Sequence, residues 1–273
     1  MKSRRTLLLA CFAGPLWPIA EAQAQQRKSL ADPLRLGVDT ALAESGLARS
    51  LQRAFGRDTG IAVQLVPGPA LPLLDALEHG ELDAAMTNAP DAELKLDQQG
   101  LIHDRRAVAL GALVLVGPAP KGRTPDPAGV AGSRDVADAL QRISTVAAMP
   151  GTLQFLSAAD GSGTHAAEQA LWRSAKVAPA APWYTAADKG ASLIAQARAR
   201  GAYGLVERGS WAAVGGAPLA VLVEGDPLLD VPVHVMRSFR INHPAGKIFV
   251  GWITGRKGAS VVAAHRGYRA PKR

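Results

Sequence analysis

The chain has 273 residues, of which 48% are hydrophobic and 20% are charged, and its formal net charge is +8. This length is enough for one large domain or for two lobes of ordinary size. The basic balance is compatible with an anionic ligand and equally with a solvated basic surface. Net charge alone gives no support for nucleic-acid binding, and after the first residues no stretch is long and apolar enough to span a membrane.

The first residues have the pattern of a secretory signal peptide. Basic residues within 2–5 precede an apolar run, and Ala22-Gln23-Ala24 forms the small-x-small pattern that signal peptidase recognises. We therefore expect a signal peptide over 1–24, cleaved after Ala24, and a mature chain in the periplasm. The paired arginines resemble a twin-arginine signal, so the export route stays open.

Removing this segment changes the chemistry that the mature chain can carry. It removes Cys11, the only cysteine, so neither a disulfide nor thiol chemistry is expected. It also removes three basic residues and Glu21, which lowers the formal charge from +8 to +6 (8 − 3 + 1).

Beyond the signal, apolar residues alternate between strand and helix periodicity. Period-two patterns predict strands, and apolar residues on one helical face predict helices between them. Gly80 suits the position after a helix end. This β-α-β-α-β order is typical of a parallel sheet with helices on its faces. Strands are expected at 34–38, 61–66 and 83–87, with helices from about Ser45 and over about 71–79.

The next apolar run, at 107–116, predicts a buried strand that leaves the first lobe, and a Pro- and Gly-rich linker follows at 119–132. A second lobe and a return helix are expected after the linker, and 266–273 should be a solvated basic tail. Helices are expected around 133–147, from Ser162, at 188–200 and around 248–253, and strands at 155–157, 202–206, 220–223 and 231–236. The predicted divisions are 34–116 for the first part of lobe I, 117–222 for lobe II, and 223–273 for the return to lobe I with the tail.

The most informative stretch is Asp160-Gly-Ser162-Gly163-Thr164, which follows a predicted strand and opens a predicted helix. A helix N-terminus exposes unpaired N–H groups and a partial positive charge. The two hydroxyl residues add donors, and the glycines let the backbone approach a ligand closely. This segment is either an anion cradle or an ordinary capped helix start, because Ser, Thr and Asp are common N-caps.

This stretch resembles the anion loop of periplasmic phosphate-binding proteins. With His165, Glu168 and Trp172 it is still more similar to the tungstate-binding proteins of ABC importers. Further matches to that family are Asn88-Ala89-Pro90 with Glu93, and Glu207-Arg-Gly-Ser-Trp211, and they run in order from about 34 to 254. The resemblance implies an α/β, two-lobed type II periplasmic-binding-protein fold. Each lobe would be a mostly parallel sheet flanked by helices, with two crossover strands and the ligand in the cleft.

The departures from this family concern the ligand loops. The family's hydroxyl-rich first loop here reads Val38-Asp39-Thr40, so one hydroxyl remains and a carboxylate is added. The second loop reads Pro67-Gly68-Pro69, in which the prolines donate no N–H. Ala158 replaces an arginine expected before the Asp160 turn.

Asp39 has three interpretations, which the sequence leaves open. Its carboxylate caps the loop or the next helix without facing the ligand, accepts a proton from a protonated ligand, or binds a cation or an amine. A fully ionised dianion about 4 Å from it would be repelled by several kcal/mol per unit charge at an effective dielectric near 20. Four basic residues could replace the lost positive charge, although each is expected to have a surface or structural role: Arg105, Arg106, Lys189 and Arg208.

The resemblance therefore implies an extracytoplasmic solute-binding protein of an ABC importer that takes a tungstate- or molybdate-type oxyanion. Alternatives are the same fold with a protonated oxyanion or a small organic ligand, and a periplasmic sensor or accessory protein without transport. The expected partners are a small anionic ligand and an inner-membrane ABC permease, with no nucleic acid, and the chain is expected to be a monomer. The candidate ligand-binding residues are Asp39, Thr40, Gly68, Ser162, Gly163 and Thr164.

No enzyme activity, cofactor or metal is expected. The six histidines show no metal-ligand spacing. Ser162 and His165 lie on one helix turn without a nucleophile elbow. His165 is expected to have a packing or hydrogen-bonding role beside the site. The aromatic residues of the second lobe are expected to pack its core.

Overall fold

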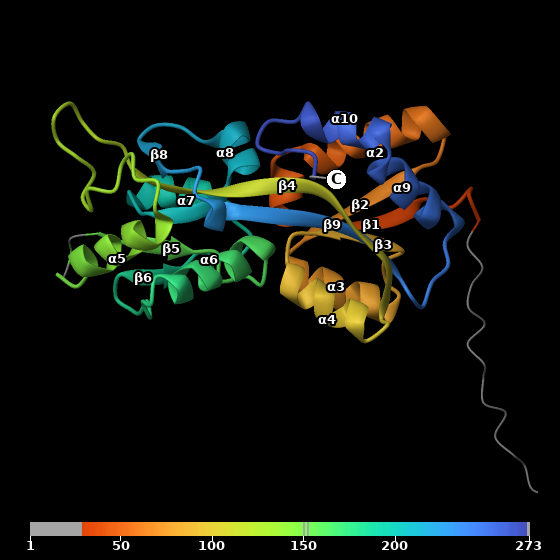
Figure 1. The fold of residues 1–273 in the computed structure, drawn as a ribbon, viewed down its shortest axis with the longest axis horizontal. Coiled ribbons are helices and arrows are strands. Elements are labelled where there is room, and N and C mark those ends of the chain that lie inside the picture. Colours follow the sequence, from red (N-terminus) through yellow and green to blue (C-terminus); the bar gives the residue numbers. More distant parts are fainter. Residues whose placement is uncertain (1–28, 150, 152, 272–273) are drawn as a thin grey trace, which may run out of the picture.

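The structure is a computed structural model that describes residues 29–149, 151 and 153–271. The expected signal peptide at 1–24 and its cleavage site lie outside the described residues. Two lobes lie side by side along the long axis of the molecule (Figure 1).

The first lobe is built around three parallel strands in the order β2-β1-β3. Helices cover both faces of this sheet, with α2, α9 and α10 on one side and α3 and α4 on the other (Figure 1). The strands are β1 (Leu34–Asp39), β2 (Val63–Gly68) and β3 (Ala84–Thr87). The helices are α1 (Thr40–Glu44), α2 (Leu47–Thr59), α3 (Ala70–His79), α4 (Pro90–Gln98), α9 (Pro244–Thr254) and α10 (Arg256–Ala263).

Two long antiparallel strands, β4 (Ile102–Pro118) and β9 (Asp230–Ser238), join the lobes. In the first lobe, β9 pairs with β3. In the second lobe, the far end of β4 pairs with β7 and β8. Both strands run from one lobe into the other, as the two predicted crossover strands should (Figure 1).

The second lobe places helices around the far end of these crossover strands. Strands β5 and β6 pair in parallel, and Phe155 of β5 forms a parallel bridge to Tyr203, next to β7. The strands are β5 (Phe155–Ser157), β6 (Tyr184–Ala186), β7 (Gly204–Glu207) and β8 (Leu219–Val223). The helices are α5 (Val136–Ala147), α6 (Gly163–Ser174), α7 (Leu193–Arg200), α8 (Arg208–Val214) and the 3-10 turn η1 (Pro227–Leu229).

The predicted parallel pairing holds for β1, β2 and β3 and for β5 with β6. The pairs that include a crossover strand are antiparallel, which adds mixed pairing to each lobe. The exact boundaries at 116/117 and 222/223 stay predictions, because β4 and β9 contribute side chains to the cores of both lobes.

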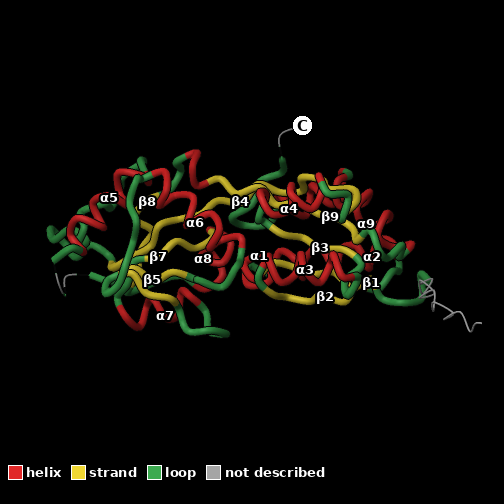
Figure 2. Tube along the Cα trace, turned by 90° about the horizontal axis from the view of Figure 1, so that it is seen from below, coloured by secondary structure: helices red, strands yellow, loops and turns green. Residues whose placement is uncertain are grey.

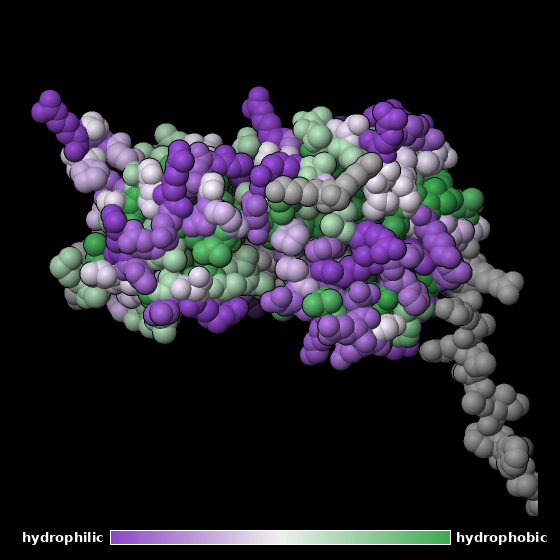
Figure 3. Space-filling view, in the orientation of Figure 1, coloured by the Kyte–Doolittle hydropathy of each residue, from purple (hydrophilic) through white to green (hydrophobic). Residues whose placement is uncertain are grey.

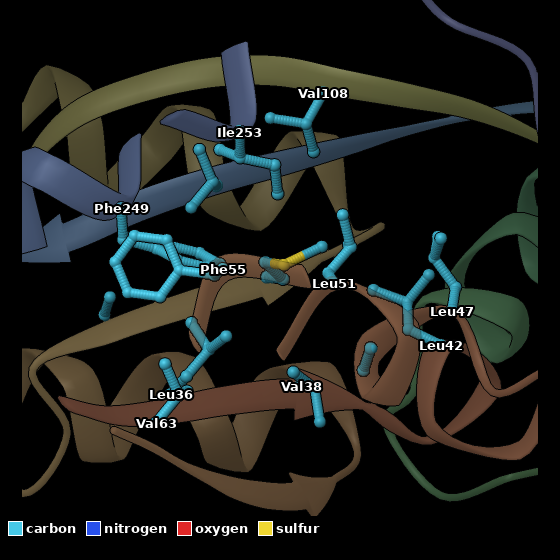
Figure 4. Close-up of a cluster of buried hydrophobic side chains, with 14 of the residues drawn as sticks. Leu36, Val38, Leu42, Leu47, Leu51, Phe55, Val63, Val108, Phe249 and Ile253 are labelled. Carbon is cyan, nitrogen blue, oxygen red and sulfur yellow. The ribbon is translucent and has the colours of Figure 1, made fainter. Parts of the chain in front are cut away.

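The core of the first lobe lies between its sheet and the helices α2, α9 and α10. Successive side chains of a strand point to opposite faces, so Met86 of β3 joins this core while Ala85 faces α3. Phe55 and Phe249 meet edge to face with ring centroids 5.1 Å apart. Figure 4 shows these rings and Ile253 directed into the space between the helices and the strands.

The core of the second lobe is aromatic. Trp172 of α6 contacts Phe155, with ring centroids 5.0 Å apart, and also Trp183. Tyr203 is fully buried and donates its hydroxyl to Asp126 at 2.7 Å. This packing is what the sequence predicted for the tryptophans of this lobe.

Three features of the chain differ from the sequence-based prediction. Strand β2 continues through Pro67, because β2 is an edge strand and this proline need not donate to a second neighbour. Helices α1, α4, α8 and α10, the 3-10 turn η1 and strand β6 were not predicted, although Pro90 at a first helical position is a usual helix start. The predicted solvated tail is wrong at Tyr268, which is buried, and Arg269 forms a backbone bridge to Leu110 of β4, whereas Arg266, Arg269 and Ala270 are exposed as predicted.

Hydrophilic side chains cover much of the surface of both lobes on the face shown in Figure 3. Within the described residues, no helix combines the length and apolar character that crossing a membrane requires.

Two isoleucines of α9 test this description of the first core. Ile253 is 1% exposed and Ile248 is 40% exposed. We expect Ile253→Ala to lower the free energy of unfolding by about 2–5 kcal/mol, because it removes packed methyl groups and leaves a cavity. Ile248→Ala should change it by less than about 1 kcal/mol. Urea denaturation measures both, and equal losses would contradict the assigned core.

Candidate functional site

The loop after β1 and the start of α6 come together between the two lobes. Asp39 ends β1 and caps α1, while Ser162 caps α6 of the other lobe through its hydroxyl, which accepts from the His165 N–H at 3.2 Å. Helices α1, α6 and α8 lie near the middle of the molecule in Figure 2. The two segments that the sequence predicted to share a cleft therefore meet.

The Asp39 carboxylate is fully buried and joins the lobes. Oδ1 accepts the Ala41 N–H of its own lobe at 3.0 Å, and Oδ2 accepts the Gly163 N–H of the other lobe at 3.2 Å. The predicted capping role is present. The same side chain also occupies the N-terminus of α6, so the carboxylate lies where an anion cradle was expected.

Burial raises the pKa of Asp39 to about 6 because desolvation disfavours the charged form. The N–H groups of Ala41, Gly163 and Ala70 oppose this rise, and the charge of Asp160 adds to it. At neutral pH, the carboxylate of Asp39 at the starts of α1 and α6 is therefore mostly ionised, and it becomes half protonated near pH 6.

A cavity with about 100 Å³ of free space opens beside this carboxylate. This space is several times the 10–15 Å³ that one water needs. Residues of both lobes line it, and three of the six candidates, Thr40, Ser162 and Thr164, are among them. The lining is Thr40, Ala41, Glu44, Ala158, Asp160, Ser162, Thr164, Ala187, Asp188, Lys189, Gly190, Ala191, Leu193, Ile194, Val206, Glu207 and Ser210.

The other three candidates have different positions. Asp39 and Gly163 are buried next to lining residues and contact each other. Gly68 is the register partner of Asp39 on β2 but does not line the cavity. The structure therefore brings five candidates to one place and leaves Gly68 at its edge.

The cavity lining is acidic, although the whole chain is basic. Four carboxylate residues, Glu44, Asp160, Asp188 and Glu207, face one basic residue, Lys189. Of the other basic candidates, Arg105 pairs with Glu93 at 3.0 Å, Arg208 pairs with Glu224 outside the lining, and Arg106 is exposed. Among the described residues that line the cavity, Lys189 is the one basic residue.

Glu207 is the most deeply buried of these acids. Burial and the charge of Asp39 raise its pKa to about 8, so it carries a proton at neutral pH. The Asn88 amide donates to one of its oxygens, and Tyr268 contacts the other at 2.9 Å. Tyr268 also reaches Ser45 at 3.1 Å, so a protonated Glu207 fits a chain of hydrogen bonds.

Several polar contacts cross between the lobes at this site. The Leu71 N–H donates to the Gly161 carbonyl at 3.0 Å, and the Ser210 hydroxyl donates to the Ala41 carbonyl at 3.3 Å. With the Asp39–Gly163 contact, they hold the starts of α1, α3, α6 and α8 together.

His165 has the supporting role that the sequence predicted. Its Nδ1 lies 3.4 Å from the Gly161 nitrogen, within the turn that precedes α6. Within the described residues, no group of three His, Cys, Asp or Glu side chains could hold a metal ion.

Sequence reasoning did not select Glu207, Glu44 or Tyr268 as site residues. Glu207 ends a buried apolar strand, and a carboxylate at a strand end is a signal that could have been used. Nothing in the local sequence indicates that Tyr268 folds back to Glu207, because the two positions lie far apart in the chain.

A model for the PBP superfamily domain matches residues 21–238, and the chain belongs to this superfamily. The two lobes, the crossover strands and the inter-lobe cavity are those of the type II periplasmic-binding-protein fold.

Individual proteins to which the chain is similar are named for a particular ligand, tungstate. The chain is 28% identical over 276 residues to the tungstate-binding protein TupA of Peptoclostridium acidaminophilum, covering 97% of this chain and 92% of that protein. A crystal structure of the tungstate ABC transporter from Geobacter sulfurreducens matches with a TM-score of 0.73 and 28% identity, over 86% of this chain and 99% of that one. The tungstate-binding protein TupA of Desulfovibrio alaskensis G20 matches with a TM-score of 0.69 and 25% identity, over 89% and 100%.

Gly163 tests the close approach of the lobes. A methyl group at this position would overlap the side chain and carbonyl of Asn88 in the first lobe. We expect Gly163→Ala to destabilise the protein by about 1–3 kcal/mol through overpacking, measured by urea denaturation. Gly251→Ala, also on a helix but with open space around it, should be neutral or stabilising. A Gly163→Ala variant as stable as the parent would contradict the contact.

Glu207 predicts a specific dependence of stability on pH. A carboxyl group with a raised folded-state pKa holds its proton more tightly when folded, so its stabilising contribution falls as pH rises from about 4.5 to about 8. We expect Glu207→Gln, which keeps a neutral side chain, to gain about 1 kcal/mol or more relative to the parent between pH 5 and pH 8. Urea denaturation across this range measures the difference, and parallel curves would show that Glu207 keeps its charge.

Proposed function

We propose that this chain is the periplasmic solute-binding protein of an ABC importer and that it binds a tungstate- or molybdate-type oxyanion between its lobes. The similarity to tungstate-binding proteins over nearly the whole chain supports this class of ligand. The observation that carries the proposal is the Asp39 carboxylate, since it accepts N–H groups from both lobes at the edge of the cavity. These donors suit a negatively charged oxygen.

In this proposal, the ligand's water shell is replaced by donors from both lobes. The hydroxyls of Thr40 and Thr164 line the cavity, and the start of α6 supplies backbone N–H groups and a partial positive charge. Ser162 orients this helix start through its cap. Two crossover strands between the lobes suit a hinge motion that opens and closes the cavity around the ligand.

Transport requires a membrane partner, which we propose to be an ABC permease that accepts the loaded two-lobed form. The expected signal peptide at 1–24 would deliver the mature chain to the compartment where this permease faces outward. The names of the relatives given above, which describe binding proteins and a transporter, agree with this role.

The acidic lining favours a second ligand of related chemistry. The lining holds four acidic residues besides Asp39, and Glu207 among them carries a proton at neutral pH. The other three, Glu44, Asp160 and Asp188, would disfavour a fully ionised anion, whereas a protonated, phosphate-like oxyanion could donate to one of them. The ionised and the protonated oxyanion would use the same N–H donors at the same site. They would differ only in whether the ligand carries a proton.

Isothermal titration calorimetry of the mature chain tests the oxyanion class. Dilute tungstate, molybdate, sulfate and phosphate are titrated at pH 5.5 and pH 7.5. We expect saturable binding of at least one anion, with the strongest response at the lower pH, and a matching rise in melting temperature. Absence of binding by all four anions at both values would refute the proposed function and leave the fold unaffected.

Thr164→Val removes one hydroxyl from the cavity lining and keeps the shape of the side chain. We expect it to weaken binding of the preferred anion by roughly tenfold, because one hydrogen-bond donor to a charged group is lost. Thr145→Val, on an exposed position of α5, is the matched control and should bind like the parent. Equal affinities in the calorimeter would place Thr164 outside the ligand contacts.

A further inference from the structure

The Asp39 carboxylate and an incoming oxyanion require the same donors. Oδ2 of Asp39 takes the N–H of Gly163, the first residue of α6, whose start is the proposed anion cradle. Ser162 and Thr164, on either side of this glycine, line the cavity. A ligand oxygen at the start of α6 must therefore share the Gly163 N–H with Asp39 or displace Asp39 from it.

From this geometry we infer that Asp39 must be protonated for the cleft to hold a fully ionised oxyanion, so that each dianion binds together with one proton. This inference rests on the proposed function and names the residue that decides which charge state of the ligand is accepted.

The charged groups around Asp39 make an ionised pair of Asp39 and ligand unfavourable. Asp160, in the turn before α6, places a negative charge near Asp39, and Glu44 lies on α1 beside the cavity. Glu207, at the end of β7, also faces Asp39, but it carries a proton at neutral pH and adds negative charge only near pH 8 and above. Tyr268, from the C-terminal segment, is close enough to feel the Asp39 charge. Among the described residues, no Lys or Arg forms an ion pair with Asp39, and Lys189 is the one basic residue of the lining.

The ionised Asp39 carboxylate competes with the ligand for the Gly163 N–H, whereas the protonated side chain can donate a hydrogen bond to the ligand. An ionised carboxylate only accepts hydrogen bonds, whereas the protonated acid carries one O–H donor and keeps an acceptor oxygen. The protonated side chain can still accept the Ala41 N–H, release the Gly163 N–H to the ligand and donate its own O–H to a ligand oxygen. The proton comes from solvent and stays between the two oxygens, so no bond of the ligand is broken.

The burial of Asp39 raises its pKa, so that the side chain can take up this proton at mildly acidic pH. Because its pKa is already raised to about 6 without a ligand, the protonated form is a substantial fraction of the protein at slightly acidic pH. A second negative charge beside it would favour the protonated form further.

Wild-type protein gives the first test, with tungstate as the probe. The heat of binding at pH 7.5 is measured in two buffers that differ in ionisation enthalpy, which yields the number of protons taken up. We expect about one proton per tungstate and a dissociation constant that rises roughly tenfold per pH unit above about pH 6.5. Zero uptake together with a constant affinity from pH 5.5 to 8 would overturn the inference.

Asp39→Asn gives the second test, because the amide is neutral like the protonated acid, has a similar shape and also offers both a hydrogen-bond donor and an acceptor. At pH 7.5 we expect it to bind tungstate at least tenfold more tightly than the parent, without the pH dependence and without proton uptake. Asp97 is an exposed aspartate of α4 that does not line the cavity. Asp97→Asn is therefore the matched control, and its tungstate affinity should depend on pH as in the wild-type protein.

The outcomes separate the inference from the proposed function. Tungstate binding that is equal in wild type and Asp39→Asn, with the same pH dependence, would overturn the inference and leave the oxyanion function standing. No oxyanion binding by either protein at pH 5.5 would overturn both. If circular dichroism shows that Asp39→Asn does not fold, Asp39→Ser and the proton count of the wild-type protein decide the question.

Discussion

The structure depends on one buried carboxylate that is held from two sides. A buried charged oxygen must be hydrogen-bonded, and Asp39 meets this requirement with one N–H from each lobe. This fixes the end of β1 against the start of α6 and brings Thr40, Ser162 and Thr164 to one cavity. In the proposed function, this contact between the lobes is also a contact that the ligand changes.

The two crossover strands determine what can move around this contact. The long strands β4 and β9 run from one lobe into the other, and each lobe has a hydrophobic core of its own. Bending of the strands between these cores would change the distance from Asp39 to Gly163 without disturbing either core. Such a hinge is the usual means by which two lobes open and close around a ligand.

Charge at the cavity differs from charge of the whole chain. The sequence is basic, yet Glu44, Asp160 and Glu207 face the cavity with Lys189 as the basic residue of the lining. The carboxylate of Asp39, in the first loop, lies buried beside this acidic lining. Fold similarity identifies the class of protein, and in our proposal the side chains at the cleft decide which charge state of the ligand is accepted.

The sequence by itself determined the elements whose signals are local. An alternating run predicted β1, short segments predicted β3 and β5 as strands, Gly80 marked the end of α3, and the Asp-Gly-Ser-Gly turn located the start of α6. The tertiary structure alone decided that Asp39 reaches Gly163, that Glu207 meets Asn88 and Tyr268, and that Gly68 stays outside the cavity. These contacts join residues far apart in the chain, and their strength comes from burial, which no local pattern encodes.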